Sequence, residues 1–275
     1  MTVLEALRFA EFALADITDE PKSEAKIIVA FLAGVEPNRL LLYSGEIDKA
    51  KLSEIIEKRR DRIPLQYILG KWWFFSSEFL VGEGVLIPRQ DTEHLVETAL
   101  ELIKNKEKPS VLDLCSGSGC IAISIAKERP DIAVTAVEKY EDAYGFLLKN
   151  IELNKTDNVT PIKADVLENC FGSFDLIVSN PPYIPRRDNE ILSEEVKKEP
   201  HTALFGGEDG LLFYREITKL WENALKPDGR LAFEVGLGQA EAVEQILKDQ
   251  GFNDITVIND LSGIQRVVFG TVNSL

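Results

Sequence analysis

The fold is decided by residues 111–122, Val-Leu-Asp-Leu-Cys-Ser-Gly-Ser-Gly-Cys-Ile-Ala. The apolar start predicts a buried strand, the glycines predict a tight turn, and the apolar residues after them predict a helix. Such a turn lets a ligand approach the backbone closely, and the helix N-terminus behind it offers unpaired N–H groups. The stretch lacks the third glycine of the dinucleotide fingerprint, and no Gly-Lys-Ser/Thr follows it, so neither phosphate-binding motif fits.

Strands and helices alternate on both sides of this stretch. We expect them over residues 110–115, 119–129, 132–138, 140–154, 159–164, 174–179, 209–224, 228–235, 239–250, 252–258 and 264–270. Repeated strand-helix units predict a mainly parallel sheet covered on both faces, so the fold class is α/β. Only a short turn separates the last two strands, which predicts that they pair antiparallel.

The strand expected over residues 174–179 ends in Asn180-Pro181-Pro182-Tyr183. Prolines cannot continue a ladder of hydrogen bonds, so this motif lies at the carboxyl end of a strand, where open α/β sheets bind ligands. A carboxamide and an aromatic ring held there by rigid proline backbone indicate a site. The alternative is a proline-rich loop that only turns the chain, because Asn-Pro is also an ordinary turn starter.

Acidic residues follow two further strands. Glu138 ends the strand 132–138, where a carboxylate can accept hydrogen bonds from both hydroxyls of a ribose. Asp165, just past the strand 159–164, is placed to reach an adenine amino group, although an exposed turn residue fits equally well. With the glycine turn, Glu138 predicts an adenosine ligand without phosphates.

These motifs together resemble a class I S-adenosylmethionine-dependent methyltransferase that methylates an amide or amino nitrogen. Three further stretches narrow the resemblance: Leu-Ile-Pro-Arg-Gln-Asp-Thr-Glu at 86–93, Glu199-Pro200 followed by Ala-Leu-Phe-Gly-Gly-Glu-Asp-Gly-Leu at 203–211, and Leu-Lys-Pro-Asp-Gly-Arg-Leu at 225–231. They are similar to the release factor glutamine methyltransferases, the HemK/PrmC family. The resemblance covers nearly the whole chain and implies a seven-stranded Rossmann-like class I methyltransferase sheet. The chain departs from the family pattern at Gln90, where proline is common, and at Gln265, where an acidic residue is common.

The resemblance also implies a cofactor and a set of site residues. S-adenosyl-L-methionine would donate the methyl group and leave as S-adenosyl-L-homocysteine. The implied cofactor-binding residues are Asp113, Cys115, Ser116, Gly117, Ser118, Gly119, Glu138, Asp165, Val166 and Asn180. The implied substrate-binding residues are Asn180, Pro181, Pro182, Tyr183 and Arg89, and Asn180, Pro181 and Tyr183 are expected to be catalytic.

The expected reaction is in-line transfer of the sulfonium methyl group to a side-chain amide nitrogen. This nitrogen is a poor nucleophile because its lone pair is delocalised. The Asn180 side-chain oxygen and the Pro181 carbonyl would each accept one N–H, which aims the lone pair at the methyl group and stabilises charge developing on nitrogen. Tyr183 would stack on the planar amide. No metal is required, and the two histidines, His94 and His201, are too scattered to form a metal site.

Composition limits the partners and the compartment. The 275 residues are 45% hydrophobic and 28% charged, as in ordinary globular proteins. A net charge of −15 opposes binding to a phosphate backbone, so no direct nucleic-acid contact is expected. Three cysteines without a C-x-x-C pair favour a reducing cytosol, and no stretch resembles a signal peptide or a membrane span. We therefore expect a cytoplasmic monomer without membrane contact.

The chain divides into three expected parts. Residues 1–62 predict an N-terminal helical bundle, which serves either as a structural cap or as a surface that recognises a substrate protein. Residues 63–90 are rich in aromatic and β-branched side chains with glycines between them, which predicts a β-hairpin linker. Residues 91–275 form the methyltransferase domain, with Asp91 as the expected N-cap of its first helix and residues 184–209 as a lid or binding loop.

Several functions remain open at this point. The first is a protein-glutamine methyltransferase that acts on the Gly-Gly-Gln motif of peptide chain release factors. A second is an adenine-specific nucleic-acid N-methyltransferase, since such enzymes share Asn-Pro-Pro-Tyr, although the charge opposes it. A glutamine methyltransferase of a ribosomal protein is a third, and a non-catalytic protein that binds S-adenosylmethionine is a fourth.

Overall fold

The computed structural model describes residues 1–272, which form two compact units. The helical unit comprises Met1–Gly70 and Ser193–Lys198, and the sheet unit comprises Lys71–Leu192 and the chain from Glu199 onward. The division therefore falls after Gly70, within the stretch 63–90 for which a linker was predicted. None of the helices in the described residues is long and apolar enough to cross a membrane.

The helical unit packs short helices around an apolar core. They are α1 (Val3–Leu14), α2 (Pro21–Ala33), η1 (Pro37–Leu42), α3 (Lys49–Arg60), α4 (Leu65–Leu69) and η4 (Val196–Lys198). Helix α1 begins with a capping box, in which the Thr2 hydroxyl accepts a bond from the Glu5 N–H and the Glu5 carboxylate accepts one from the Thr2 N–H. Helix α2 ends at Gly34, whose φ of 67° suits the left-handed cap.

A buried arginine ties the helices of this unit together. Arg59 of α3 is 2% exposed and donates two hydrogen bonds to the Glu24 carboxylate of α2, at 2.9 and 3.1 Å, and one to the Ile63 carbonyl at 2.7 Å. Glu195, from the segment 193–198, lies 3.5 Å from Arg59 and 3.3 Å from Arg62. These ion pairs attach the segment 193–198 to the helical unit.

The sheet unit is built on seven strands in the order β5-β4-β3-β6-β7-β9-β8. Their bounds are β3 (Ser110–Leu114), β4 (Ala133–Glu138), β5 (Val159–Lys163), β6 (Phe174–Ser179), β7 (Leu225–Glu234), β8 (Asn253–Asn259) and β9 (Gln265–Thr271). Strands β5, β4, β3, β6 and β7 pair parallel, whereas β9 pairs antiparallel with both β7 and β8. The predicted α/β class, the seven strands and the antiparallel ending are confirmed.

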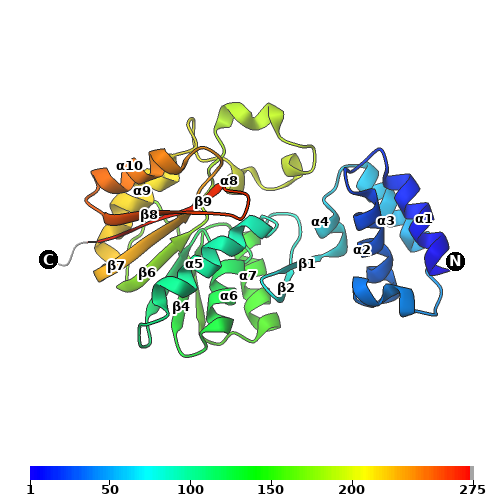
Figure 1. The fold of residues 1–275 in the computed structure, drawn as a ribbon, viewed down its shortest axis with the longest axis horizontal. Coiled ribbons are helices and arrows are strands. Elements are labelled where there is room, and N and C mark those ends of the chain that lie inside the picture. Colours follow the sequence, from blue (N-terminus) through cyan, green and yellow to red (C-terminus); the bar gives the residue numbers. More distant parts are fainter. Residues whose placement is uncertain (273–275) are drawn as a thin grey trace. The chain divides into compact units, whose positions relative to one another are not determined.

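Helices cover both faces of this sheet (Figure 1). Helices α5 (Glu93–Ile103), α6 (Cys120–Glu128) and α7 (Glu141–Asn154) pack on one face, and α9 (Leu212–Trp221) and α10 (Ala240–Asp249) pack on the other. Strand β3 shows why two apolar layers form: Val111 joins the first, whereas its neighbour Leu112 joins the second. A strand buried on both faces needs the continuous apolar run found there.

The predicted hairpin is shorter than the linker 63–90. Strands β1 (Lys71–Phe74) and β2 (Ser77–Leu80) pair antiparallel through a two-residue turn in which Phe75 and Ser76 have φ values of 43° and 66°. Residues 65–69 instead form the short helix α4, which Gly70 ends in the left-handed conformation at φ 72°.

The predicted N-cap at Asp91 is wrong. The one-turn helix η2 (Gln90–Thr92) runs directly into α5, so Asp91 lies inside a continuous helical stretch. Its carboxylate pairs with Arg266 at 2.9 Å, which draws it away from the backbone. The segment expected to be an irregular loop, 184–209, contains η3 (Arg186–Ile191), η4 and α8 (His201–Leu204).

Candidate active site

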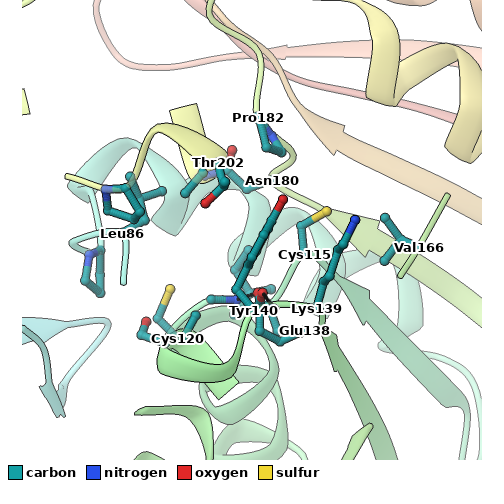
Figure 2. A pocket seen from close by; sticks show the side chains of 18 of the residues that line it. Leu86, Cys115, Cys120, Glu138, Lys139, Tyr140, Val166, Asn180, Pro182 and Thr202 are labelled. Carbon is teal, nitrogen blue, oxygen red and sulfur yellow. Dashed lines mark hydrogen bonds between the residues drawn. The ribbon is translucent and has the colours of Figure 1, made fainter. Parts of the chain in front are cut away.

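One cavity lies at the carboxyl ends of β3, β4 and β6, as an open α/β sheet predicts. It holds about 930 Å³ of space, including the part open to solvent. Its walls include the predicted residues Arg89, Cys115, Ser116, Gly117, Ser118, Glu138, Asp165, Val166, Asn180 and Pro182. Figure 2 shows side chains of the glycine turn, Glu138 and Asn180 around this cavity.

The glycine turn presents backbone to the cavity. Cys115 and Gly117 have φ values of 61° and 54°, and a Cβ added to Gly117 would meet no atom within 4 Å. Gly119, with φ 82°, is packed instead, because its Cβ would lie 2.5 Å from the Leu147 side chain. Gly117 therefore keeps space open for a ligand, while Gly119 allows α7 to pack against the turn.

Asp113 does not line the cavity, contrary to its expected direct role. It is fully buried in β3, where its Oδ2 accepts a hydrogen bond from the Ala122 N–H at 3.2 Å, and its Oδ1 has no partner within residues 1–272. Burial raises the pKa of Asp113 to about 7. The structure places this carboxyl behind the turn, where it holds the start of α6.

Glu138 is the acidic wall of the cavity. It is 6% exposed, and its two oxygens accept hydrogen bonds from the Gly117 N–H at 2.9 Å and the Tyr140 N–H at 2.8 Å. Burial raises the pKa of Glu138, and these N–H groups oppose the rise. Each oxygen keeps a further lone pair, so the carboxylate fits the hydroxyls of a ribose.

Asp165 and Val166 lie at the adjoining wall. The Asp165 carboxylate accepts hydrogen bonds from Lys139 at 2.5 Å and from the Leu167 N–H at 2.9 Å. Partial burial raises the pKa of Asp165, but these bonds outweigh burial and leave the pKa below its usual range. The ionised Asp165 carboxylate can accept a hydrogen bond from an adenine amino group, and the apolar Val166 side chain beside it suits the adenine ring. Together with the open space at Gly117 and the Glu138 acceptor, this set fits the adenosine part of S-adenosylmethionine.

Asn180 enters the cavity from the end of β6. Its Nδ2 donates a hydrogen bond to the Thr92 Oγ1 at 3.1 Å. A planar carboxamide that directs its nitrogen toward Thr92 directs its oxygen elsewhere, so this oxygen stays available as an acceptor.

Of the other three residues of the Asn-Pro-Pro-Tyr motif, one lines the cavity and two lie behind its wall. Pro182 lines the cavity, whereas Pro181 and Tyr183 do not. The Tyr183 ring packs with the apolar layer around α9 and α10, and its burial raises its pKa. Its carbonyl accepts a hydrogen bond from the Gln239 Nε2 at 2.9 Å.

The second family stretch, residues 203–211, braces this motif. Ile184 forms a parallel bridge with Phe205, and the Ile184 N–H donates to the Leu204 carbonyl at 2.8 Å. A Cβ on Gly206 would lie 2.4 Å from the Pro182 carbonyl, and one on Gly210 would lie 2.2 Å from the Tyr183 carbonyl. These glycines are therefore needed because two backbones approach closely.

Arg89 lines the cavity beside a buried partner. Its guanidinium donates to one oxygen of Glu199, whose other oxygen accepts a bond from the Ile87 N–H at 3.0 Å. The Glu199 side chain is only 1% exposed. The two stretches 86–93 and 199–211, which the resemblance singled out separately, are thus joined at one edge of the cavity.

Sequence reasoning missed several wall residues. They include Leu86, Ile87, Pro88, Thr92, Cys120, Lys139, Tyr140, Leu167, Pro200, Thr202 and Phe213. Lys139 and Tyr140 directly follow Glu138, so their place after a strand end was a usable signal. Thr92 lies in the family stretch 86–93, but no local pattern pointed to its contact with Asn180, which joins positions 88 residues apart. Within residues 1–272 no cluster of three metal-ligating side chains occurs.

Comparison with known proteins identifies the family. The Methyltransferase small domain matches residues 92–213, and the PrmC N-terminal domain matches residues 5–70. A release factor glutamine methyltransferase of Clostridium acetobutylicum is 38% identical over an alignment that covers all of both chains. The chain belongs to the release factor glutamine methyltransferase family. A member from Fusobacterium nucleatum is 45% identical over 81% of this chain but only 64% of its own length.

Solved structures agree with the fold of a methyltransferase. The hMettl16 catalytic domain in complex with MAT2A 3'UTR hairpin 6 aligns with a TM-score of 0.57 at 14% identity, over 82% of this chain and 81% of that chain. This likeness concerns the fold alone. The family resemblance seen in the sequence is confirmed, and this chain is a methyltransferase.

Proposed function

We propose that this methyltransferase transfers a methyl group from S-adenosyl-L-methionine to the side-chain amide nitrogen of a glutamine in a peptide chain release factor. The observation that carries the proposal is the Asn180 carboxamide, which enters the same cavity as Glu138 and the glycine turn and has its nitrogen engaged by Thr92. The names of its relatives supply the class of substrate. The glutamine would be that of the Gly-Gly-Gln motif.

The cofactor side of the cavity fits the proposed donor. Glu138 would accept the ribose hydroxyls, Asp165 would accept the adenine amino group, and Gly117 leaves room for the rest of the ligand. Bound there, S-adenosyl-L-methionine supplies an electrophilic methyl group on a positively charged sulfur. S-adenosyl-L-homocysteine is the product.

The acceptor side must activate a weak nucleophile. In the transfer, the bond between the acceptor nitrogen and the methyl carbon forms, the bond between that carbon and sulfur breaks, and one proton leaves the nitrogen. The Asn180 oxygen would accept one acceptor N–H, and the Pro181 carbonyl, which does not line the cavity in this structure, would accept the other only after a local rearrangement. These bonds hold the nitrogen lone pair toward the methyl group and stabilise the positive charge that develops. Tyr183 would contact the flat face of the acceptor amide only after its ring moves toward the cavity.

A folded protein is the proposed acceptor. We propose that the helical unit recognises the release factor, while the cavity receives its glutamine. The formal charge of −15 disfavours a nucleic-acid acceptor. Further parts of the proposal are a monomeric state, a cytoplasmic location and the absence of direct nucleic-acid or membrane contact.

The test is a parallel assay of acceptors. The chain is incubated with methyl-labelled S-adenosyl-L-methionine and, separately, with a release factor, a ribosomal protein and duplex DNA. Label on the release factor is expected, and a release factor whose Gly-Gly-Gln glutamine is replaced by alanine should receive none. Label on duplex DNA or on the ribosomal protein alone would contradict the proposed substrate.

A further inference from the structure

The Asn180 carboxamide is held by the Thr92 hydroxyl in the wall of the cavity. Its Nδ2 donates to the Thr92 Oγ1 at 3.1 Å, and Thr92 itself is only 2% exposed. A carboxamide can rotate by half a turn and exchange its oxygen for its nitrogen. Only the orientation with the oxygen toward the acceptor can accept an N–H, so something must prevent the other one.

Glu234 lies beside Asn180, because β6 and β7 pair in a register that places Ser179 opposite Phe233. It ends β7, is 3% exposed, does not line the cavity, and has an Oε2 without a partner among the described residues. Burial raises the pKa of Glu234 to about 7, and hydrogen bonding from Thr92 and Asn180 opposes that rise. Burial of a carboxyl is costly unless its oxygens are hydrogen-bonded, and Oε2 has no partner among the described residues.

We propose that Thr92 and Glu234 are positioning residues, which hold the Asn180 carboxamide with its N–H groups toward the protein and its oxygen toward the acceptor. This inference rests on the proposed function, in which Asn180 accepts a hydrogen bond from the acceptor amide. Thr92 accepts one Asn180 N–H, which leaves its own hydroxyl proton free to be donated toward the Glu234 carboxyl. Above about pH 7 the Glu234 carboxyl is ionised and only accepts hydrogen bonds, so it opposes a rotation that brings the Asn180 oxygen toward it.

The surroundings of Glu234 support an ionisable carboxyl at this place. The charged or titratable groups that interact with it are Asp91 of η2, Arg266 of β9, Cys120 of α6, Tyr214 of α9 and Tyr183. Asp91 and Arg266 are paired at 2.9 Å, so their opposite effects on Glu234 largely cancel. Burial keeps the cysteine and both tyrosines neutral by raising their pKa values. The Thr92 and Asn180 side chains are therefore the uncharged polar groups left to interact with this carboxyl.

The test separates orientation from binding. Thr92→Val removes the hydroxyl and keeps the shape, Thr92→Ser restores the hydroxyl, and Glu234→Gln replaces an acceptor by a group that also donates. Thr218→Val is the matched control, since Thr218 of α9 is also buried and its Oγ1 has no partner within residues 1–272. Single-turnover methylation of a release factor should slow roughly tenfold in Thr92→Val and Glu234→Gln, about the effect of one lost hydrogen bond. Cofactor affinity should stay within about twofold, Thr92→Ser should recover most of the rate that Thr92→Val loses, and Thr218→Val should match the parent.

A second readout needs no acceptor. In the cofactor-free protein, NMR should show slow solvent exchange of the Asn180 side-chain N–H protons in the parent and in Thr92→Ser, and fast exchange in Thr92→Val. A parental methylation rate in Thr92→Val, or equally fast exchange in all proteins, would overturn the inference. A loss of cofactor affinity in Thr92→Val as large as its loss of rate would do the same, because Thr92 would then be a wall of the cavity only. If the parent methylates no glutamine, the proposed function fails, and the exchange measurement still decides the orientation.

Discussion

Replacing Glu138 by alanine removes the strongest acceptor from the cofactor side of the cavity. In the structure its two oxygens already hold the Gly117 and Tyr140 N–H groups at 2.9 and 2.8 Å, and the side chain is 6% exposed. Bound cofactor would add hydrogen bonds from the ribose hydroxyls to the same carboxylate. Hydrogen bonds to a charged group contribute about 1.5–3 kcal/mol, so affinity should fall roughly 10- to 150-fold.

Calorimetry with S-adenosyl-L-homocysteine measures this loss without any acceptor. Glu141→Ala is the matched control, because Glu141 lies three residues further on and has the same charge, but its side chain is 76% exposed and faces Lys163. The control should bind as the parent does. An unchanged affinity of Glu138→Ala, with an unchanged unfolding transition, would remove Glu138 from the cofactor site and refute the assignment of this wall.

Four further changes test other parts of the molecule. Asn180→Ala should lower the single-turnover methylation rate by roughly 10²–10³ with little change in cofactor affinity, and a parental rate would contradict its role. Gly117→Val should weaken cofactor binding more than Glu138→Ala does, because a side chain would enter open space at a φ of 54°; parental affinity in calorimetry would disprove this. Arg59→Ala should destabilise the helical unit by about 3–5 kcal/mol, since it leaves Glu24 unpaired, and a loss below about 1 kcal/mol in chemical unfolding would contradict this. The pKa of Glu234 is about 7 in the folded chain against an ordinary 4.5, so the folded state binds this proton more tightly and loses stability as the pH rises through that window. Relative to the parent, Glu234→Gln should therefore gain up to roughly 3 kcal/mol in free energy of unfolding as the pH rises from about 4.5 to 7. A stability difference between the two proteins that does not change with pH would refute the raised pKa.

The sequence predicted those parts of the site that local pattern controls. The glycine turn, Glu138 and Asn180 each follow an apolar strand, and the carboxyl ends of parallel strands meet at one edge of a sheet. Strand periodicity and turn residues act over a few positions, so they can be read without the fold. The same reasoning explains why the seven strands and the final antiparallel pair were predicted.

Sequence patterns did not predict the contacts between distant positions. The bond from Asn180 to Thr92 and the pairing of Arg89 with Glu199 join residues 88 and 110 positions apart, and no periodicity records them. Asp113 shows the opposite error. A residue beside a ligand turn was expected at the ligand, but Asp113 lies in a strand that is buried on both faces, and its carboxylate accepts a hydrogen bond from the Ala122 N–H.

Local propensity also failed where tertiary contact decided the outcome. Asp91 has the chemistry of an N-cap, yet its ion pair with Arg266 of β9 takes its carboxylate away from the backbone. Residues 65–69 are apolar enough for a strand, but Gly70 at φ 72° closes them as a helical turn. Asp91 lies near the start of a helical stretch and residues 65–69 form a helix of only five residues, so few local residues fix either conformation.

Mass spectrometry of a methylated release factor tests the central claim most directly. The intact chain, S-adenosyl-L-methionine and a folded release factor are incubated together, and the factor is then digested and sequenced by fragmentation. We predict one added methyl group on the side-chain amide of the Gly-Gly-Gln glutamine, and its absence when Asn180→Ala replaces the parent for the same short time. A methyl group on any other residue of the factor, or no methyl group on it while duplex DNA in a parallel reaction gains one on adenine, would contradict the account.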